Sequence, residues 1–121
     1  MKKFILVLIM SVIVMGCSSV HHRKGHAISG RATCYESKYE GKTTANGELY
    51  DSGKMTCAAK DIEFGKKIRV ENIATGKSVY VVVNDRGPKQ DGWLVTLSEA
   101  AFKKIANKGE TFVEVEIEVV E

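Results

Sequence analysis

The clearest folding signal in the chain is the run Lys67-Ile-Arg-Val-Glu71, followed by Ser78-Val-Tyr-Val-Val-Val83. The first run alternates polar and apolar residues throughout and the second does so in part, and a period of two is typical of a strand with one buried face. Ala74-Thr-Gly76 lies between them and is typical of a turn. The stretch therefore predicts a β-hairpin. Asn84-Asp-Arg-Gly-Pro88, with the only proline in the chain, predicts the end of its second strand.

Further strands are predicted on both sides of this hairpin. Short strands are expected over residues 28–35 and 54–59. Residues 111–120 predict a half-buried strand, with Val113, Val115, Ile117 and Val119 on one face and Glu114, Glu116 and Glu118 on the other. Residues 39–52 are rich in Gly, Thr, Asn and Asp, which predicts an ordered loop.

One helix is predicted after Leu97. Ser98 is its expected N-cap and Glu99 lies in its first turn, where a negative charge is favourable. Its apolar stripe consists of Ala100, Ala101, Phe102, Ile105 and Ala106, and Gly109 is expected to end it. Six or so short strands with one helix in a single small domain, residues 28–121, favour a mainly β fold built as a closed or nearly closed barrel, because closure hides strand edges.

The N-terminus has the pattern of an export signal. Met1-Lys2-Lys3 is positive, and Phe4 to Met15 is an apolar run too short to span a bilayer permanently. The following Val14-Met15-Gly16-Cys17 resembles the bacterial lipobox, which implies a signal peptide over residues 1–16 and a lipid-modified Cys17. A simple secretory signal with a chance cysteine is the alternative.

Lipidation would anchor the chain to a membrane of the bacterial cell envelope, since acyl chains bind bilayers stably when several are present. Ser18 and Ser19 follow the cysteine, with no Asp to suggest retention in the inner membrane. In a double-membraned bacterium this pattern implies the periplasmic face of the outer membrane.

Residues 17–27 are polar and predict a flexible tether. Its histidines, His21, His22 and His26, could bind a metal, but no Cys or carboxylate accompanies them at ligand spacing, so neither a metal nor a cofactor is expected. Removing residues 1–16 takes away Lys2 and Lys3, and the formal charge falls from +3 to +1. This balance gives no reason to expect a nucleic acid partner.

Two cysteines remain after Cys17. In an oxidising compartment Cys34 and Cys57 could form a disulfide. Two free buried thiols are the alternative, because sequence alone does not establish that the two residues are close.

Two predicted loops concentrate polar residues that a core does not need. The first is Thr43-Thr-Ala-Asn-Gly-Glu48, followed by Asp51, and the second is Asn84-Asp-Arg-Gly-Pro88. Functional residues are common on loops held by a rigid scaffold. Each loop contributes a carboxylate, and pairs of carboxylates cleave glycosidic bonds in many enzymes.

A set of ordered motifs extends this interpretation. In chain order they are Gly30-Arg-Ala-Thr33, Thr44-Ala-Asn-Gly-Glu48, Tyr50-Asp51, Met55-Thr56, Phe64-Gly65, Ile68-Arg-Val-Glu-Asn72, Gly76-Lys-Ser-Val79, Val83-Asn-Asp-Arg-Gly-Pro88, Leu97-Ser98 and Ala100-Ala101. Together they resemble the rare lipoprotein A (RlpA) family, a six-stranded double-psi β-barrel related to expansins and to some lytic transglycosylases. The resemblance covers the chain from about Gly30 to its end.

The resemblance implies a lytic transglycosylase that acts on the glycan strands of peptidoglycan. Such an enzyme cuts between N-acetylmuramic acid and N-acetylglucosamine without water and leaves a 1,6-anhydro sugar. It places the acid/base function on Asp85, with Glu48 as its carboxylate partner. Asp51, Asn84 and Arg86 would contact substrate.

The aromatic residues Tyr35, Tyr39, Tyr50 and Trp93 could stack on sugar rings. Trp93 is the preferred candidate because it follows the Asp85 segment and belongs to no periodic apolar stripe.

Structural explanations compete with the catalytic assignments. Asp85 could cap a tight turn or pair with Arg86, and Asp51 is typical of an Asx turn. Glu48 could be a solvated loop residue.

Two positions depart from the family pattern. Ala59 stands where the family usually has a histidine, and Thr96 where it usually has an aspartate before Leu97-Ser98. A threonine forms hydrogen bonds but does not serve as a base at ordinary pH. These departures favour a second hypothesis, a non-catalytic, expansin-like module that binds peptidoglycan. A third is an envelope lipoprotein that recruits other proteins, which the sequence does not identify.

Overall fold

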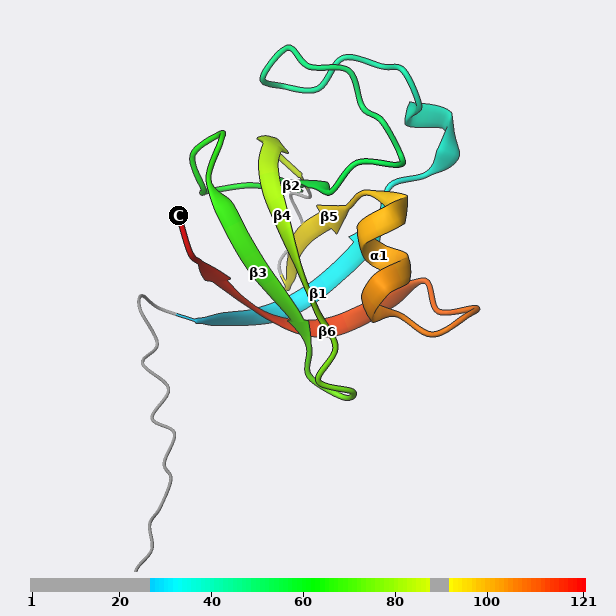
Figure 1. Cartoon of the computed structure of the whole chain (residues 1–121), viewed down its shortest axis with the longest axis vertical. Coiled ribbons are helices and arrows are strands. Elements are labelled where there is room, and N and C mark those ends of the chain that lie inside the picture. The colour runs from blue at the N-terminus through cyan, green and yellow to red at the C-terminus, as the bar shows by residue number, and fades with distance from the viewer. Residues whose placement is uncertain (1–26, 88–91) are drawn as a thin grey trace, which may run out of the picture.

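The computed structural model describes residues 27–87 and 92–121, which form a mainly β domain with one α-helix (Figure 1). Its strands are β1 (Ile28–Cys34), β2 (Thr56–Ala59), β3 (Lys67–Asn72), β4 (Ser78–Asp85), β5 (Trp93–Leu97) and β6 (Phe112–Val119). A 3₁₀ turn, Ser37–Tyr39, follows β1. The predicted signal peptide, Cys17 and the tether histidines lie outside the described residues.

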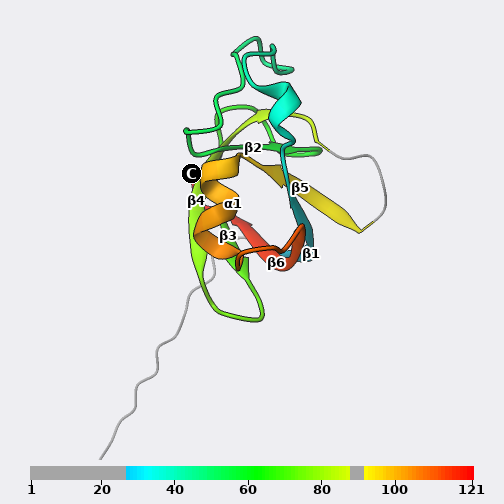
Figure 2. The same ribbon diagram turned by 90° about the vertical axis from the view of Figure 1, so that its right-hand side faces the viewer.

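The six strands form a closed barrel in the order β1-β5-β2-β4-β3-β6, with β6 pairing back onto β1. The β1–β5 and β2–β4 pairs are parallel, and the other four pairs are antiparallel. Figures 1 and 2 show the segment between β1 and β2 projecting beyond one end of the barrel. Each of these six strands has a neighbour on both sides, and the predicted barrel with one short helix is confirmed.

Every second residue of these strands points into the barrel, and the apolar side chains at these positions fill its interior. In β4 the inward residues are Val79, Val81 and Val83, and in β6 they are Val113, Val115 and Ile117. Ile68 and Val70 of β3 complete one side, and the predicted β3–β4 hairpin forms as expected. Burying each such side chain stabilises the fold by about 1.5–3 kcal/mol.

Two strands differ from the prediction. β5 had no predicted bounds, because its short Trp93-Leu-Val-Thr-Leu97 run has no clear period; β1 and β2 flank it on both sides. β4 was expected to end before Asn84 but continues to Asp85. It continues because β2 still offers a partner: beyond a bulge, Ala58 pairs with Asp85.

The helix α1 (Glu99–Ile105) begins as predicted and ends earlier. The Ser98 hydroxyl accepts a hydrogen bond from the N–H of Ala101 (3.3 Å), and Glu99 lies in the first turn. The helix ends at Ile105 rather than near Gly109, because Ala106 adopts an extended conformation. In the described part of the chain, no helix is long and apolar enough to cross a bilayer.

The buried Asn72 joins the end of β3 to the end of α1. Its amide nitrogen donates to the carbonyl of Ile105 (2.7 Å), and its oxygen accepts from the N–H of Ala74 (2.9 Å). We expect Asn72→Ala to lower the free energy of unfolding by about 1–3 kcal/mol, because both backbone groups lose their partner. Urea unfolding measures this change. Asn107→Ala, at an exposed asparagine, is the matched control and should stay within about 0.5 kcal/mol of the native chain. Equal losses in both variants would contradict the role assigned to Asn72.

Candidate active site

Asp85 is the last residue of β4, at the point where the strand leaves the sheet. The bulge between β2 and β4 falls just before it: Val83 pairs with Cys57 and Asp85 with Ala58, so Asn84 has no partner residue on β2. A bulge commonly redirects side chains beside functional sites. Here it presents Asn84 and Asp85 in succession to the loop that contains Glu48.

Three donors hold the Asp85 carboxylate. Its Oδ1 accepts hydrogen bonds from the backbone N–H groups of Ala45 (3.0 Å) and Arg86 (2.9 Å), and its Oδ2 accepts from the hydroxyl of Tyr35 (2.5 Å). Capping of the Arg86 N–H fits the turn explanation, but the other two donors come from distant segments. This arrangement fixes the half-buried carboxylate in one orientation.

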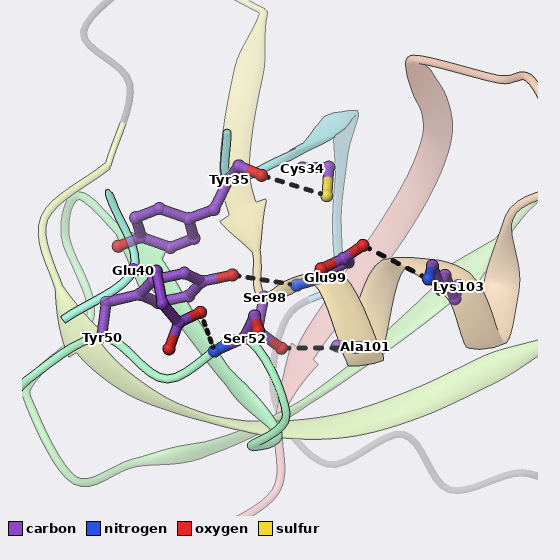
Figure 3. Close-up of polar contacts among 9 residues, drawn as sticks. All are labelled: Cys34, Tyr35, Glu40, Tyr50, Ser52, Ser98, Glu99, Ala101 and Lys103. Atoms are coloured by element: carbon purple, nitrogen blue, oxygen red, sulfur yellow. Dashed lines mark hydrogen bonds and ion pairs between the residues drawn. The ribbon is translucent and has the colours of Figure 1, made fainter. Parts of the chain in front are cut away.

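Tyr35 acts on Asp85 in a way that the sequence did not predict. It follows β1, and its ring stacks on Tyr50, with centroids 4.2 Å apart and planes at 24° (Figure 3). Burial, with the hydrogen bond to Asp85 as the next cause, raises the pKa of Tyr35 far above its ordinary value. The phenol therefore remains a hydrogen-bond donor over the whole working pH range. The sequence suggested sugar stacking for this residue and gave no signal for a contact 50 positions away.

Tyr50 supports this stack from below. Its hydroxyl accepts a hydrogen bond from the N–H of Glu99 at the first turn of α1 (3.1 Å), as Figure 3 shows. Next to it, Glu40 accepts from the N–H of Ser52 (3.1 Å) and holds the two ends of the loop together. The helix, the loop and the Tyr35 ring are thus joined into one support for Asp85.

Glu48 reaches the same region through Asn84. The Asn84 amide nitrogen donates to Glu48 Oε1 (3.1 Å), and the Asn84 carbonyl accepts from the N–H of Asn46 (3.2 Å). Together with the Ala45 contact to Asp85, these bonds dock the loop onto the end of β4. The structure therefore brings the two predicted carboxylates into one region, while Glu48 itself stays exposed.

The Glu48 loop is tied by its own hydrogen bonds. The Asn46 side-chain oxygen accepts from the hydroxyl of Thr44 (2.8 Å) and from the N–H of Glu48 (3.0 Å). Gly47 has φ +95°, a conformation that glycine adopts readily. Thr43 and Leu49 close the loop through an isolated β-bridge. Polar turn residues thus give the loop a defined shape, as predicted for an ordered loop.

Arg86 points away from Asp85. Its Nη1 donates to the carbonyls of Ala59 (2.9 Å), Lys60 (3.1 Å) and Ile62 (2.8 Å), and its guanidinium lies 3.8 Å from the centroid of the Phe64 ring. These contacts hold the segment after β2 and differ from the ion pair with Asp85 that the sequence left open.

Gly87 completes the turn after Arg86. It has φ +84°, and a Cβ there would meet the carbonyl oxygen of Ala58 at 2.9 Å. Only glycine therefore fits where the chain leaves β4 against β2.

The other predicted site residues lie in different surroundings. Asp51 is exposed and accepts from the N–H of Gly53 (2.9 Å), the Asx turn considered above. Trp93 begins β5 and packs edge-on against Phe112, with Arg31 over its ring. These contacts are with β1 and β6 rather than with Asp85 or Glu48, and the role of Trp93 in sugar binding stays a prediction.

The two positions that depart from the family pattern lie in the sheet. Ala59 is 1% exposed and belongs to the apolar core. Thr96 pairs with Ala58 on one side and Thr33 on the other. The first contributes packing and the second a hydroxyl, and neither provides an ionisable group.

Cys34 and Cys57 are free thiols, so the predicted disulfide is not formed; Cys57 is buried, as the alternative expected, and Cys34 is half-buried. Both residues pair with Leu97, from opposite sides of β5. Two strand spacings amount to about 9.6 Å, which exceeds the reach of a disulfide. Burial raises the pKa of Cys57 to about 12, so this thiol is unreactive at ordinary pH.

Two hollows lie near this region. One, of about 770 Å³, is lined by Glu48 and Asn84 among others, and lies on the outer face of β2 and β4. The other, of about 660 Å³, lies between Tyr35 and α1. Glu48 and Asn84 both line the first hollow, so it gives an extended ligand room beside the Glu48 carboxylate.

Comparison with a family model described as lytic transglycolase gives a match over residues 27–117. Similar proteins include the endolytic peptidoglycan transglycosylases RlpA of Vibrio cholerae, 42% identical over 101 residues, and of Pseudomonas aeruginosa, 43% identical over 95 residues. The matches cover 84% and 77% of this chain but 38% and 28% of those proteins. The chain thus spans less than two fifths of the length of these relatives.

Solved structures with a similar fold include two proteins of other kinds. The Streptomyces papain inhibitor has a TM-score of 0.66 at 23% identity, covering 80% of this chain and 96% of that one. A mutant expansin of Clavibacter michiganensis in complex with cellohexaose has a TM-score of 0.61 at 20% identity, covering 79% and 51%. At these identities the likeness concerns the fold alone.

Proposed function

The chain belongs to the lytic transglycolase family of double-psi β-barrel domains, and from this membership we propose that it is a peptidoglycan lytic transglycosylase. It would cleave glycan strands between N-acetylmuramic acid and N-acetylglucosamine and leave 1,6-anhydro-muramyl ends. The observation that carries the proposal is the Asp85 carboxylate, held by three donors at the end of β4 and joined to Glu48 through Asn84.

The proposed chemistry needs a proton donor and then a proton acceptor. In its acid form Asp85 gives a proton to the glycosidic oxygen, and N-acetylglucosamine departs as an alcohol. The muramyl 6-hydroxyl then attacks its own anomeric carbon and returns a proton to Asp85, so no water is consumed. Glu48 assists by stabilising the positive charge that develops on the sugar ring.

Product analysis tests this function. The native chain is incubated with glycan strands from which the stem peptides have been removed, and the products are analysed by mass spectrometry. We expect fragments that end in 1,6-anhydro-N-acetylmuramic acid. Release of reducing ends alone would indicate hydrolysis, and an absence of fragments would overturn the proposal.

A non-catalytic glycan-binding module is the second candidate. The observation that favours it is Ala59, a core residue where the family usually has a histidine. Such a module would sediment with purified sacculi and release no fragments, so the same incubation separates the two candidates.

The membrane anchor at Cys17 is also part of the proposal. We expect the native chain, expressed in a lipoprotein-processing bacterium, to partition into the detergent phase of Triton X-114. Cys17→Ser should move it to the aqueous phase, because the acyl chains supply nearly all of the affinity for the bilayer. Cys34→Ser, at a cysteine within the barrel domain, is the matched control and should leave the partition unchanged. Detergent partition of the Cys17→Ser variant would contradict lipidation at this residue.

A further inference from the structure

We infer that the hollow beside Glu48 is a subsite for the acetamido group of an N-acetylated sugar. The inference rests on the proposed action on glycan and specifies how the chain distinguishes such a glycan from a plain glucan. Thr56 of β2 and Val82 and Asn84 of β4 line the hollow from the barrel, and Leu49 and Met55 line it from the loop segment.

The barrel side of the hollow is the outer face of the sheet. Val81 and Val83 point into the core, so Val82 and Asn84 point outward, and Thr56 lies opposite Val82 in the parallel β2–β4 pair. Such an outward face would be solvated without the loop that contains Glu48. The loop covers Asn84, which is only 3% exposed.

Two of the residues that line this hollow each have a buried side-chain oxygen with no hydrogen-bond partner among the described residues: Asn84 Oδ1 and Thr56 Oγ1. Native proteins satisfy nearly all such atoms, and an unsatisfied one calls for an explanation, such as a bound ligand. The orientation of the Asn84 amide is fixed, because its nitrogen donates to Glu48. The unpaired atom of Asn84 is therefore its Oδ1, a hydrogen-bond acceptor without a donor.

The nearby loop has no backbone donor left for Asn84 Oδ1. Each N–H group from Thr44 to Glu48 already donates elsewhere; the acceptors, in chain order, are the Glu48 carbonyl, Asp85 Oδ1, the Asn84 carbonyl, the Thr44 carbonyl and Asn46 Oδ1. The missing donor must therefore come from outside this loop. A ligand that enters the hollow can provide it.

An acetamido group matches these features. Its N–H can donate to Asn84 Oδ1, its carbonyl can accept from the Thr56 hydroxyl, and its methyl group can contact Leu49, Met55 and Val82. The 2-hydroxyl of a plain glucan lacks both the carbonyl and the methyl group. It leaves the apolar part of the hollow uncovered, and its single oxygen would have to serve both unpaired atoms at once.

Calorimetric titration tests the subsite with two neutral probes, the tetramer of N-acetylglucosamine and cellotetraose, which differ at the 2-position. We expect the native chain to bind the acetylated tetramer about tenfold more tightly, the effect of one to two net hydrogen bonds. Thr56→Val should reduce this preference to about threefold, while Thr56→Ser, which keeps the hydroxyl, should retain most of it. Leu49→Ala tests the methyl contact at a residue that is 63% exposed, where loss of folding is not a concern.

Equal affinity of the native chain for the two tetramers would overturn the inference, as would an unchanged preference in both Thr56→Val and Leu49→Ala. The proposed function fails in a different way. A chain that releases anhydro-muramyl products but binds both tetramers equally keeps its function and lacks the subsite. A chain that prefers the acetylated tetramer but releases no products has the subsite without the activity.

Discussion

Asp85→Asn is expected to abolish the release of anhydro-muramyl products from glycan strands. The amide keeps the size of the side chain but neither gives nor takes a proton at useful pH, so both proposed steps lose their proton carrier. General acid–base groups typically contribute about 10²–10⁴-fold to the rate, and we expect a loss of this order. Mass spectrometry of timed digests measures it.

The control for this variant is the same chemical change elsewhere. Asp61→Asn alters an exposed aspartate in the turn after β2 and should leave the rate within about twofold of the native chain. Thermal unfolding of both variants separates loss of the proton carrier from loss of the fold, since the amide that replaces the Asp85 carboxylate must face the same three donors. Native-like product release by a folded Asp85→Asn variant would reject the role of Asp85.

The parts of the fold that the sequence predicts are those with local signals. β6 and the β3–β4 hairpin have alternation that any strand with one buried face needs, and the Ser98 cap begins a helix by contacts within its own first turn. β5 lacks such a signal because it has only five residues, and its first three, Trp93, Leu94 and Val95, are all apolar and show no alternation. Its existence depends on the closed barrel rather than on its own period.

The candidate site divides in the same way. The carboxylates of Glu48 and Asp85 can be identified from the sequence, because they lie in loops rich in polar residues that packing of the core does not require. The bulge that places Asn84 under the Glu48 loop, and the hydrogen bond from Tyr35, join segments that are distant in sequence. The predicted Cys34–Cys57 disulfide fails for a related reason, because whether two cysteines are adjacent depends on which strand lies between them.

Ala59, a core residue without an ionisable group, is the residue on which the choice between a transglycosylase and a non-catalytic binding module depends. Without an imidazole at this position, proton transfer would rest on the two carboxylates, and the donors around Asp85 would have to supply the remaining orientation. Tyr35 is the only side-chain donor among the three contacts described here, and the other two come from the backbone. Substitution can remove the Tyr35 contact alone, which makes this residue the sharpest test of how Asp85 is positioned.

Tyr35→Phe is expected to lower kcat about 10–100-fold while KM changes little. A hydrogen bond to a charged group contributes roughly 1.5–3 kcal/mol, and its loss frees Asp85 Oδ2 to rotate away from the orientation that the reaction needs. Tyr35 is thus a positioning residue, and steady-state kinetics on glycan strands give both constants. The ring itself should remain in place, since the stack on Tyr50 does not involve the hydroxyl.

Tyr50→Phe is the matched control for this prediction. It removes a hydroxyl from the other ring of the same stack, and this hydroxyl contacts the Glu99 N–H instead of Asp85. It should therefore lower the free energy of unfolding by about 1 kcal/mol and leave kcat close to the native value. If both variants lower kcat equally, the stack acts as a structural unit and the hydroxyl of Tyr35 has no special role. If only Tyr35→Phe does so, the contact with Asp85 orients the carboxylate, as its three-donor geometry indicates.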